Sequence, residues 1–116
     1  MNAVIFEVMP KIGHTADYFS HAAHLKPILE TMDGFISVER FESVSQPGKF
    51  VSLSFWRDED AVKAWRNTMD HRATQRAGRE HIFADYRLRV ASVIRDYGMF
   101  ERDEAPLDSR THHDPS

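Results

Sequence analysis

Histidine and glutamate side chains are the groups in this sequence that could move a proton during a reaction. His71 follows Asp70, and a neutral imidazole there could act as a general base or as an axial heme ligand. Glu7 is a carboxylate in an otherwise apolar stretch, where burial would raise its pKa and make it a base. Each residue also has a plain structural interpretation. His71 would be a surface residue in the first turn of a helix, and Glu7 would pair with an arginine of the last strand.

Two further histidines and two tryptophans could contribute to a binding site. His21 and His24 lie three residues apart, which places both on one side of a helix, but no further ligand completes a metal site, so we expect no metal. Trp56 and Trp65 could stack on a planar ligand, although packing in the core is the commoner role of tryptophan.

Basic residues gather between residues 63 and 79, where five bases accompany one acid, Asp70. The five are Lys63, Arg66, Arg72, Arg76 and Arg79. Such a cluster could bind a carboxylate, a phosphate or a heme propionate, or it could be a solvated helical face balanced by nearby acids. Trp65 is the one aromatic residue in this stretch, and the series of interleaved aromatics that would stack on nucleobases is missing, so we expect no nucleic-acid binding.

Charge and composition exclude several classes of protein. The 116 residues carry a net charge of −3, and residues 101–116 hold all of it, with five acids against two bases. No cysteine is present, which excludes disulfides, thiolate metal sites and a thiol nucleophile. No apolar run approaches the ~20 residues of a membrane span, and the first residues lack the features of a signal peptide, so we expect a cytoplasmic protein without membrane contact. Glycine-rich phosphate loops and G-x-S-x-G are absent.

The first half of the chain reads as a strand, a helix and a hairpin. Residues 2–9 form an apolar run that Pro10 ends, which predicts a strand. Thr15 is a plausible N-cap for a helix with an apolar stripe, and Pro27 predicts a kink or a restart within it. Asp33-Gly34 predicts a turn, and residues 35–43 and 49–56 predict two strands of a hairpin.

The second half predicts two short helices and a long strand. Acidic residues 58–60 suit the start of a helix that carries Trp65, and Asp70 could cap a second one that ends at Gly78. A strand lies within residues 82–97, alternating between Tyr86 and Leu88 on one side and arginines on the other.

The order β-α-β-β-α-β is that of an α+β, ferredoxin-like fold, which we expect over residues 1–99, followed by a flexible acidic tail over residues 100–116. The strands at 2–9 and 49–56 are apolar on both sides. Helices cover one face of such a sheet, so a second copy of the chain is the best cover for the other face, and we predict a homodimer through the sheet faces.

Several runs of residues together resemble the antibiotic biosynthesis monooxygenase family. They are residues 33–41 (DGFISVERF), 52–56 (SLSFW), 64–67 (AWRN), 71–72 (HR) and 78–79 (GR). The resemblance covers residues 1–98 and implies a dimeric α+β barrel with a pocket between the sheet and the helices of each chain. Some members are oxygenases that oxidise aromatic substrates without a cofactor, and others bind and degrade heme.

The heme-degrading branch resembles this chain in part. Trp65 matches the tryptophan of that branch's second helix. The position of its strand asparagine falls on Glu7, and its axial histidine falls at or near Gln75, one helical turn after His71.

For a cofactor-free oxygenase, the resemblance and the residue types imply a base, an apolar pocket and a donor for a substrate anion. His71 or Glu7 would be the base, Trp65 and Phe35 would form walls, Arg72 or Tyr86 would hold the anion, and His21 would contact the substrate. We therefore expect a small monooxygenase that oxidises an aromatic or apolar molecule with O2 and without a tightly bound cofactor. A heme-binding or heme-degrading protein and a non-catalytic dimeric ligand-binding module are the alternatives.

Overall fold

The computed structural model describes residues 1–113, without the side chains of Met69, Asp70, His71, Thr74 and His113. One antiparallel sheet has the strand order β2-β3-β1-β4, as a ferredoxin-like fold requires. The strands are β1 (Asn2–Pro10), β2 (Phe35–Glu42), β3 (Phe50–Trp56) and β4 (Phe83–Ser92). The helices are α1 (Thr15–Glu30), α2 (Glu59–Arg66), α3 (Met69–Ala77), the π-helix η1 (Gly78–Ile82) and α4 (Leu107–His113).

Helix α1 differs from expectation at its start and at its proline. Thr15 is the first helical residue, and the N-cap is His14, whose Nδ1 lies 2.9 Å from Asp17 Oδ2. The helix continues through Pro27 without the predicted restart. Pro27 cannot donate to the carbonyl of Ala23, but both residues are exposed, so water can satisfy that carbonyl.

The turns around α2 have clear local causes. The side chain of Asp58 accepts a hydrogen bond from the Ala61 amide at 2.9 Å and caps the helix. Gly34 has a φ of +84°, and a Cβ added there would lie 2.6 Å from Ala61 Cβ. Because both the backbone conformation and the close approach exclude a side chain, glycine is required where β2 begins.

The π-helix η1 is the one element within residues 1–99 that the sequence did not predict. Gly78, which reads as the end of a helix, instead begins this wide turn. A Cβ at Gly78 would lie 2.4 Å from the ring of Phe83, so the ring packs directly against the backbone. Short π-helical segments are rare and recur at functional sites.

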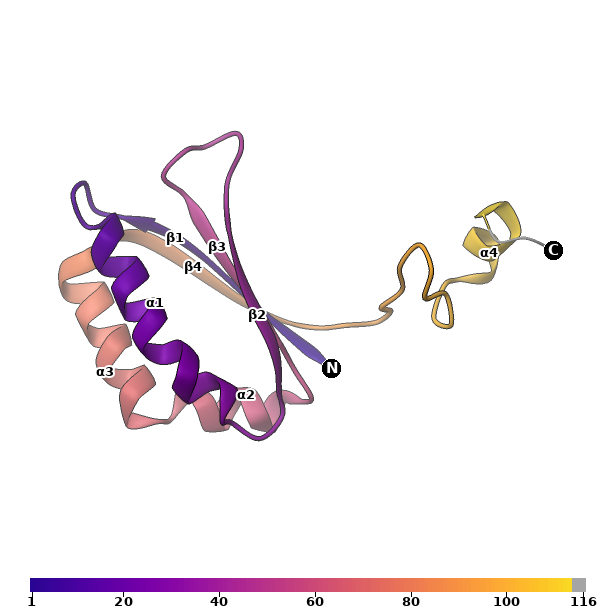
Figure 1. Ribbon diagram of the computed structural model, residues 1–116, viewed down its shortest axis with the longest axis horizontal. Helices are drawn as coiled ribbons and strands as arrows, with labels where there is room; N and C mark the ends of the chain where they lie inside the picture. The colour runs from indigo at the N-terminus through magenta and orange to yellow at the C-terminus, as the bar shows by residue number, and fades with distance from the viewer. Residues whose placement is uncertain (114–116) are drawn as a thin grey trace.

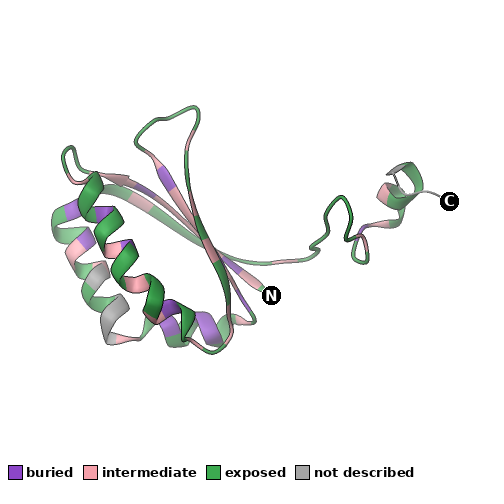
Figure 2. Ribbon diagram, viewed as in Figure 1, coloured by how far each residue is buried: buried purple, intermediate pink, exposed green. Residues whose placement is uncertain are grey.

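The helices α1, α2 and α3 all lie on one face of the sheet (Figure 1). Buried residues concentrate between these layers, and the solvent sides of the helices are exposed (Figure 2). The buried residues form two separate clusters: one contains Leu29, Trp56, Ala61, Val62 and Trp65. The other contains Val8, Tyr18, Phe50 and Ile82. The opposite face of the sheet carries no helix in the described chain.

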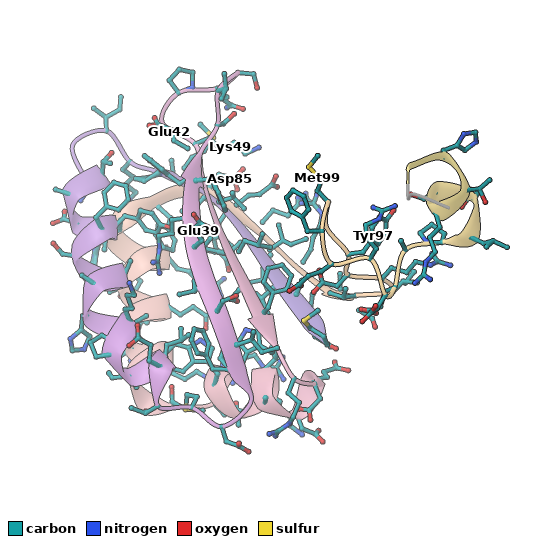
Figure 3. All side chains as sticks on the ribbon, turned by 45° about the vertical axis from the view of Figure 1, so that its right-hand side comes forward. Glu39, Glu42, Lys49, Asp85, Tyr97 and Met99 are labelled. Atoms are coloured by element: carbon teal, nitrogen blue, oxygen red, sulfur yellow. The ribbon has the colours of Figure 1, made fainter. Side chains whose placement is uncertain are left out.

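Beyond β4 the described chain leaves the sheet and leads to the short helix α4 (Figure 1). Tyr97 and Met99 lie on this outer segment (Figure 3), and the side chain of Met99 is 82% exposed. The flexibility expected of residues 100–116 stays a prediction. None of the helices within residues 1–113 combines the length and the apolar character that a membrane-spanning helix needs.

Candidate functional site

A cavity of about 430 Å³ lies between the sheet and the helices, and it separates the two buried clusters. Sites for small molecules commonly enclose about 300–1,000 Å³. All four strands contribute lining residues, and so do α1, α2, α3 and η1. The lining comprises Val4, Phe6, Tyr18, His21, Ala22, Leu25, Leu29, Val38, Arg40, Ser52, Ser54, Trp65, Gln75, Arg79, Phe83, Tyr86 and Leu88.

Aromatic side chains form two walls of this cavity. At one end Trp65 stacks on Trp56, with ring centroids 6.4 Å apart. The indole of Trp56 is buried and donates to Ser54 Oγ at 2.9 Å. At the other end the rings of Phe6, Phe83 and Tyr86 lie 5.6–6.0 Å from one another. These walls suit a flat or apolar ligand.

Polar donors occupy one part of the lining. Ser52 lies directly opposite Arg40 across the β2–β3 pair, and both side chains line the cavity. Tyr18 reaches the same cavity from α1. Neither Tyr18 Oη nor Arg40 Nε, both buried, has a hydrogen-bond partner among the described atoms. Burial raises the pKa of Tyr18, and the positive charge of Arg40 opposes part of that rise.

Three of the residues expected from the sequence line the cavity together: Trp65, Tyr86 and His21. They come from α2, β4 and α1, so only the fold brings them to one place. His21 is the one histidine among the described lining side chains, which makes it the candidate base within the cavity.

Glu7 lies on the other face of the sheet, away from the cavity. Its neighbour Phe6 lines the cavity, and successive strand residues point to opposite faces. The carboxylate pairs with Arg89 Nη1 at 2.9 Å and lies 3.8 Å from Lys49 Nζ. The hydrogen bond from Arg89 and the charge of Lys49 lower the pKa of Glu7, so the expectation of a raised pKa is wrong. The arginine pairing considered from the sequence is the one observed.

Phe35 and Arg72 are also outside the lining, and His71 cannot be placed. Phe35 packs edge-on against Trp56, with centroids 5.4 Å apart. Arg72 donates to Asn67 Oδ1 at 2.6 Å on the surface. The side chain of His71 lies outside the described residues, although its backbone belongs to α3. Of the basic cluster, Arg79 alone is among the lining residues.

Sequence reasoning missed Tyr18, Arg40 and Ser52. Tyr18 belongs to the buried, apolar side of α1, which the spacing of that helix predicts, but its side chain also lines the cavity. A usable signal was present in the strands: Ser52 alternates with apolar Val51 and Leu53, and Arg40 shares its face with Val38. Polar residues on the inner face of a sheet are unusual unless they meet a ligand or one another.

The described side chains can be compared with those that a metal or heme requires. No three histidine, aspartate or glutamate side chains in the described part of the chain approach closely enough to hold a metal ion. The resemblance places the axial histidine of the heme-degrading branch at or near Gln75, and Gln75 lines the cavity. Glutamine is not among the usual axial ligands of heme, so this position differs from that branch.

Two curated relatives match this chain in sequence. The jasmonate monooxygenase ABM of Pyricularia oryzae is 45% identical over 93 residues, which are 80% of this chain. Those residues are 43% of that protein, so the chain spans less than half the length of this relative. Protein YqjZ of Bacillus subtilis is 30% identical over 93 residues, which are 80% of this chain and 79% of that protein.

Solved structures and a family model complete the comparison. The structure of Rv0793 from Mycobacterium tuberculosis has a TM-score of 0.75 to this chain at 18% identity, and the match covers 84% of this chain and 98% of that chain. This likeness establishes the fold. The model of the antibiotic biosynthesis monooxygenase family matches residues 1–77. The chain therefore belongs to the antibiotic biosynthesis monooxygenase family.

Proposed function

We propose that this chain is a monooxygenase that oxidises an apolar small molecule with O2 inside the cavity, without a tightly bound cofactor. The observation that carries the proposal is the cavity of about 430 Å³, in which His21 meets the aromatic walls that include Trp65 and Tyr86. A base in an apolar cavity is what this chemistry needs, since the protein must remove a proton and hold the resulting substrate anion.

The reaction that fits is the oxidation of an acidic methylene to a carbonyl. His21 takes a proton from carbon, and the substrate anion then reduces O2. One oxygen atom becomes the new carbonyl oxygen, and the other leaves as water with the two hydrogens of the methylene. This balance needs no external reductant. The rings of Trp65 and Phe6 exclude water from the anion, because both line the cavity.

The substrate panel follows from this chemistry and from the relatives. Anthrones carry the acidic methylene that the proposed step needs, and hydroxyquinones, whose acidic group is a hydroxyl, test whether the cavity also accepts a substrate that loses its proton from oxygen. Jasmonic acid joins the panel because the relative at 45% identity is a jasmonate monooxygenase. The activity of that relative is only a proposal for this chain, because this chain spans less than half of the relative's length.

Oxygen uptake with this panel tests the function. We expect uptake with at least one member, and a loss of about 100-fold or more in His21→Ala, within the range typical of a general base. His24→Ala is the matched control, because His24 is exposed on the same helix and outside the lining. If His21→Ala retains full activity, His21 is not the base. If no substrate gives uptake while ligands still bind, the chain is a binding module.

Hemin titration tests the heme alternative. A stoichiometric Soret shift that is lost in His71→Ala would support heme binding at α3 and would contradict the cofactor-free proposal. A shift that survives His71→Ala but is lost in His21→Ala would place the iron against α1. We expect no stoichiometric shift, because Gln75, which is not a usual axial ligand of heme, lies at or near the position that the resemblance gives to the axial histidine.

We further propose that two copies pair through the uncovered face of the sheet and that the protein is cytoplasmic. Apolar residues alternate onto this face from the central strands β1 and β3: Ala3, Ile5, Val51, Leu53 and Phe55. We expect light scattering to give the mass of two chains and Leu53→Glu to give one, since a charge at the centre of an apolar interface is costly. The mass of one chain for the unaltered protein would contradict the dimer.

A further inference from the structure

The polar part of the cavity has a composition that an apolar substrate alone does not explain. Arg40 brings a permanent positive charge to the lining, and Arg79 brings a second one. No aspartate or glutamate is among the described lining residues. None of the ion pairs formed by described side chains includes either arginine. The cavity therefore has an excess of positive charge with no acid of its own to balance it.

The neutral groups beside Arg40 are hydrogen-bond donors as well. The raised pKa of Tyr18 keeps its hydroxyl protonated at neutral pH, so Oη can donate. That atom is buried and has no partner among the described atoms, as is true of Arg40 Nε. Ser52, across from Arg40 on β3, adds a third hydrogen-bonding group.

Buried donors without acceptors are costly in an empty protein, and they are expected where a ligand supplies the acceptor. Resting on the proposed function, we propose that the substrate is an apolar molecule with one carboxylate, which Arg40 and Tyr18 bind while the apolar body extends toward Trp65. Arg40 and Tyr18 are then specificity-determining residues. A planar carboxylate accepts from both donors at once, which a neutral carbonyl does less strongly.

Arg40 and Tyr18, which together we call the anchor, are also well placed relative to the rest of the cavity lining. Tyr18 belongs to the buried cluster that also contains Val8, Phe50 and Ile82, and the centroid of its ring lies 5.9 Å from that of Phe50. Trp65 belongs to the other cluster. A ligand held at Arg40 and Tyr18 therefore spans the gap between the two clusters, where the apolar lining residues Val4, Leu25 and Leu29 contact its body.

Calorimetric titration with matched ligands tests the anchor without requiring turnover. The probes are 1-naphthaleneacetic acid and its methyl ester, which share a skeleton and differ in charge at neutral pH. We expect the acid to bind at least 10-fold more tightly than the ester, which follows from the strength of hydrogen bonds to charged groups. Equal affinity, tighter binding of the ester or no binding of either probe would overturn the proposal. Tighter binding of 1-naphthyl phosphate than of the acid would overturn the choice of carboxylate.

Variants then assign the effect to the anchor. Arg40→Gln should lose about 10–100-fold in affinity for the acid and little for the ester, and Arg40→Lys should restore part of the preference. Arg87→Gln is the matched control, because Arg87 lies opposite Glu7 on the other face of the sheet and should leave both affinities unchanged. Circular dichroism confirms that each variant is folded. A preference for the acid that survives Arg40→Gln would overturn the role of Arg40. If oxygen uptake with neutral substrates persists in Arg40→Gln, the oxygenase proposal stands whatever becomes of the anchor.

Discussion

Replacing Tyr18 by phenylalanine tests whether the buried hydroxyl is held ready for a ligand. The residue is 4% exposed, and its ring packs 5.9 Å from Phe50 and 6.1 Å from Phe83, contacts that phenylalanine would keep. Its hydroxyl oxygen is buried and has no hydrogen-bond partner among the described atoms. The substitution therefore removes one unsatisfied polar atom and very little apolar packing.

The size of the effect follows from the cost of that atom. Leaving a buried polar group unsatisfied costs about 1–3 kcal/mol. Because the positive charge of Arg40 lies near enough to lower the pKa of Tyr18, it stabilises the oxygen in part, so we take the lower end and expect Tyr18→Phe to stabilise the ligand-free protein by about 1 kcal/mol. With roughly 2.1 cal/mol/K of unfolding entropy for each of the 116 residues, Tm rises by about 4 °C.

Thermal unfolding followed by circular dichroism measures this shift, and urea unfolding measures the free energy. Tyr86→Phe is the control: Tyr86 lines the same cavity with a half-buried side chain, and we expect a change within about 0.5 kcal/mol. In the calorimetric assay the same Tyr18→Phe variant should bind 1-naphthaleneacetic acid more weakly. A fall in Tm of about 4 °C or more would show that the hydroxyl is hydrogen-bonded without a ligand, which would refute the reasoning.

Two further predictions concern residues that shape the fold around the site, Gly34 and Glu7. Gly34→Ala combines a φ of +84° with a Cβ 2.6 Å from that of Ala61, so we expect urea unfolding to show a loss of about 2–4 kcal/mol. Gly48→Ala has a φ of +87° and open space, so its loss should be only about 1 kcal/mol, and equal losses would show that Ala61 moves aside freely. The pKa of Glu7 is lowered from its usual 4.5, so its pairing with Arg89 stabilises the fold above that pH, and the contribution disappears as the pH falls through the lowered pKa. Glu7→Gln should therefore lower Tm at pH 7 and match the unaltered protein in strongly acidic buffer; a difference in Tm that is the same at every pH would contradict this.

Most of the fold was predictable, because its elements have strong local signals. The Asp33-Gly34 turn, the acidic start of α2 and the alternation in β4 predicted those elements close to their observed bounds. The π-helix η1 was not predictable in this way. Its wide turns depend on tertiary packing, here of Phe83 against Gly78, and glycine near the end of a helical pattern more commonly ends it.

The site was predictable only in part, because β1 is apolar on both of its faces. The alternation put Phe6 and Glu7 on opposite faces, but hydrophobicity could not tell which face the helices would cover. The helices cover the face with Phe6, so Glu7 is directed away from the cavity. His21 and Trp65 were predictable as lining residues because the apolar stripes of their helices must face the sheet.

Because Phe83 packs closely on Gly78, a substitution at position 78 could change the size of the cavity without replacing any residue that lines it. Phe83 is part of the cavity wall, and position 78 stands behind that wall. The φ of Gly78 is not in the left-handed region, so the backbone would accept alanine, and the added methyl group would displace the ring toward the cavity. An alanine at position 78 would therefore narrow the cavity although Gly78 itself is not among its lining residues.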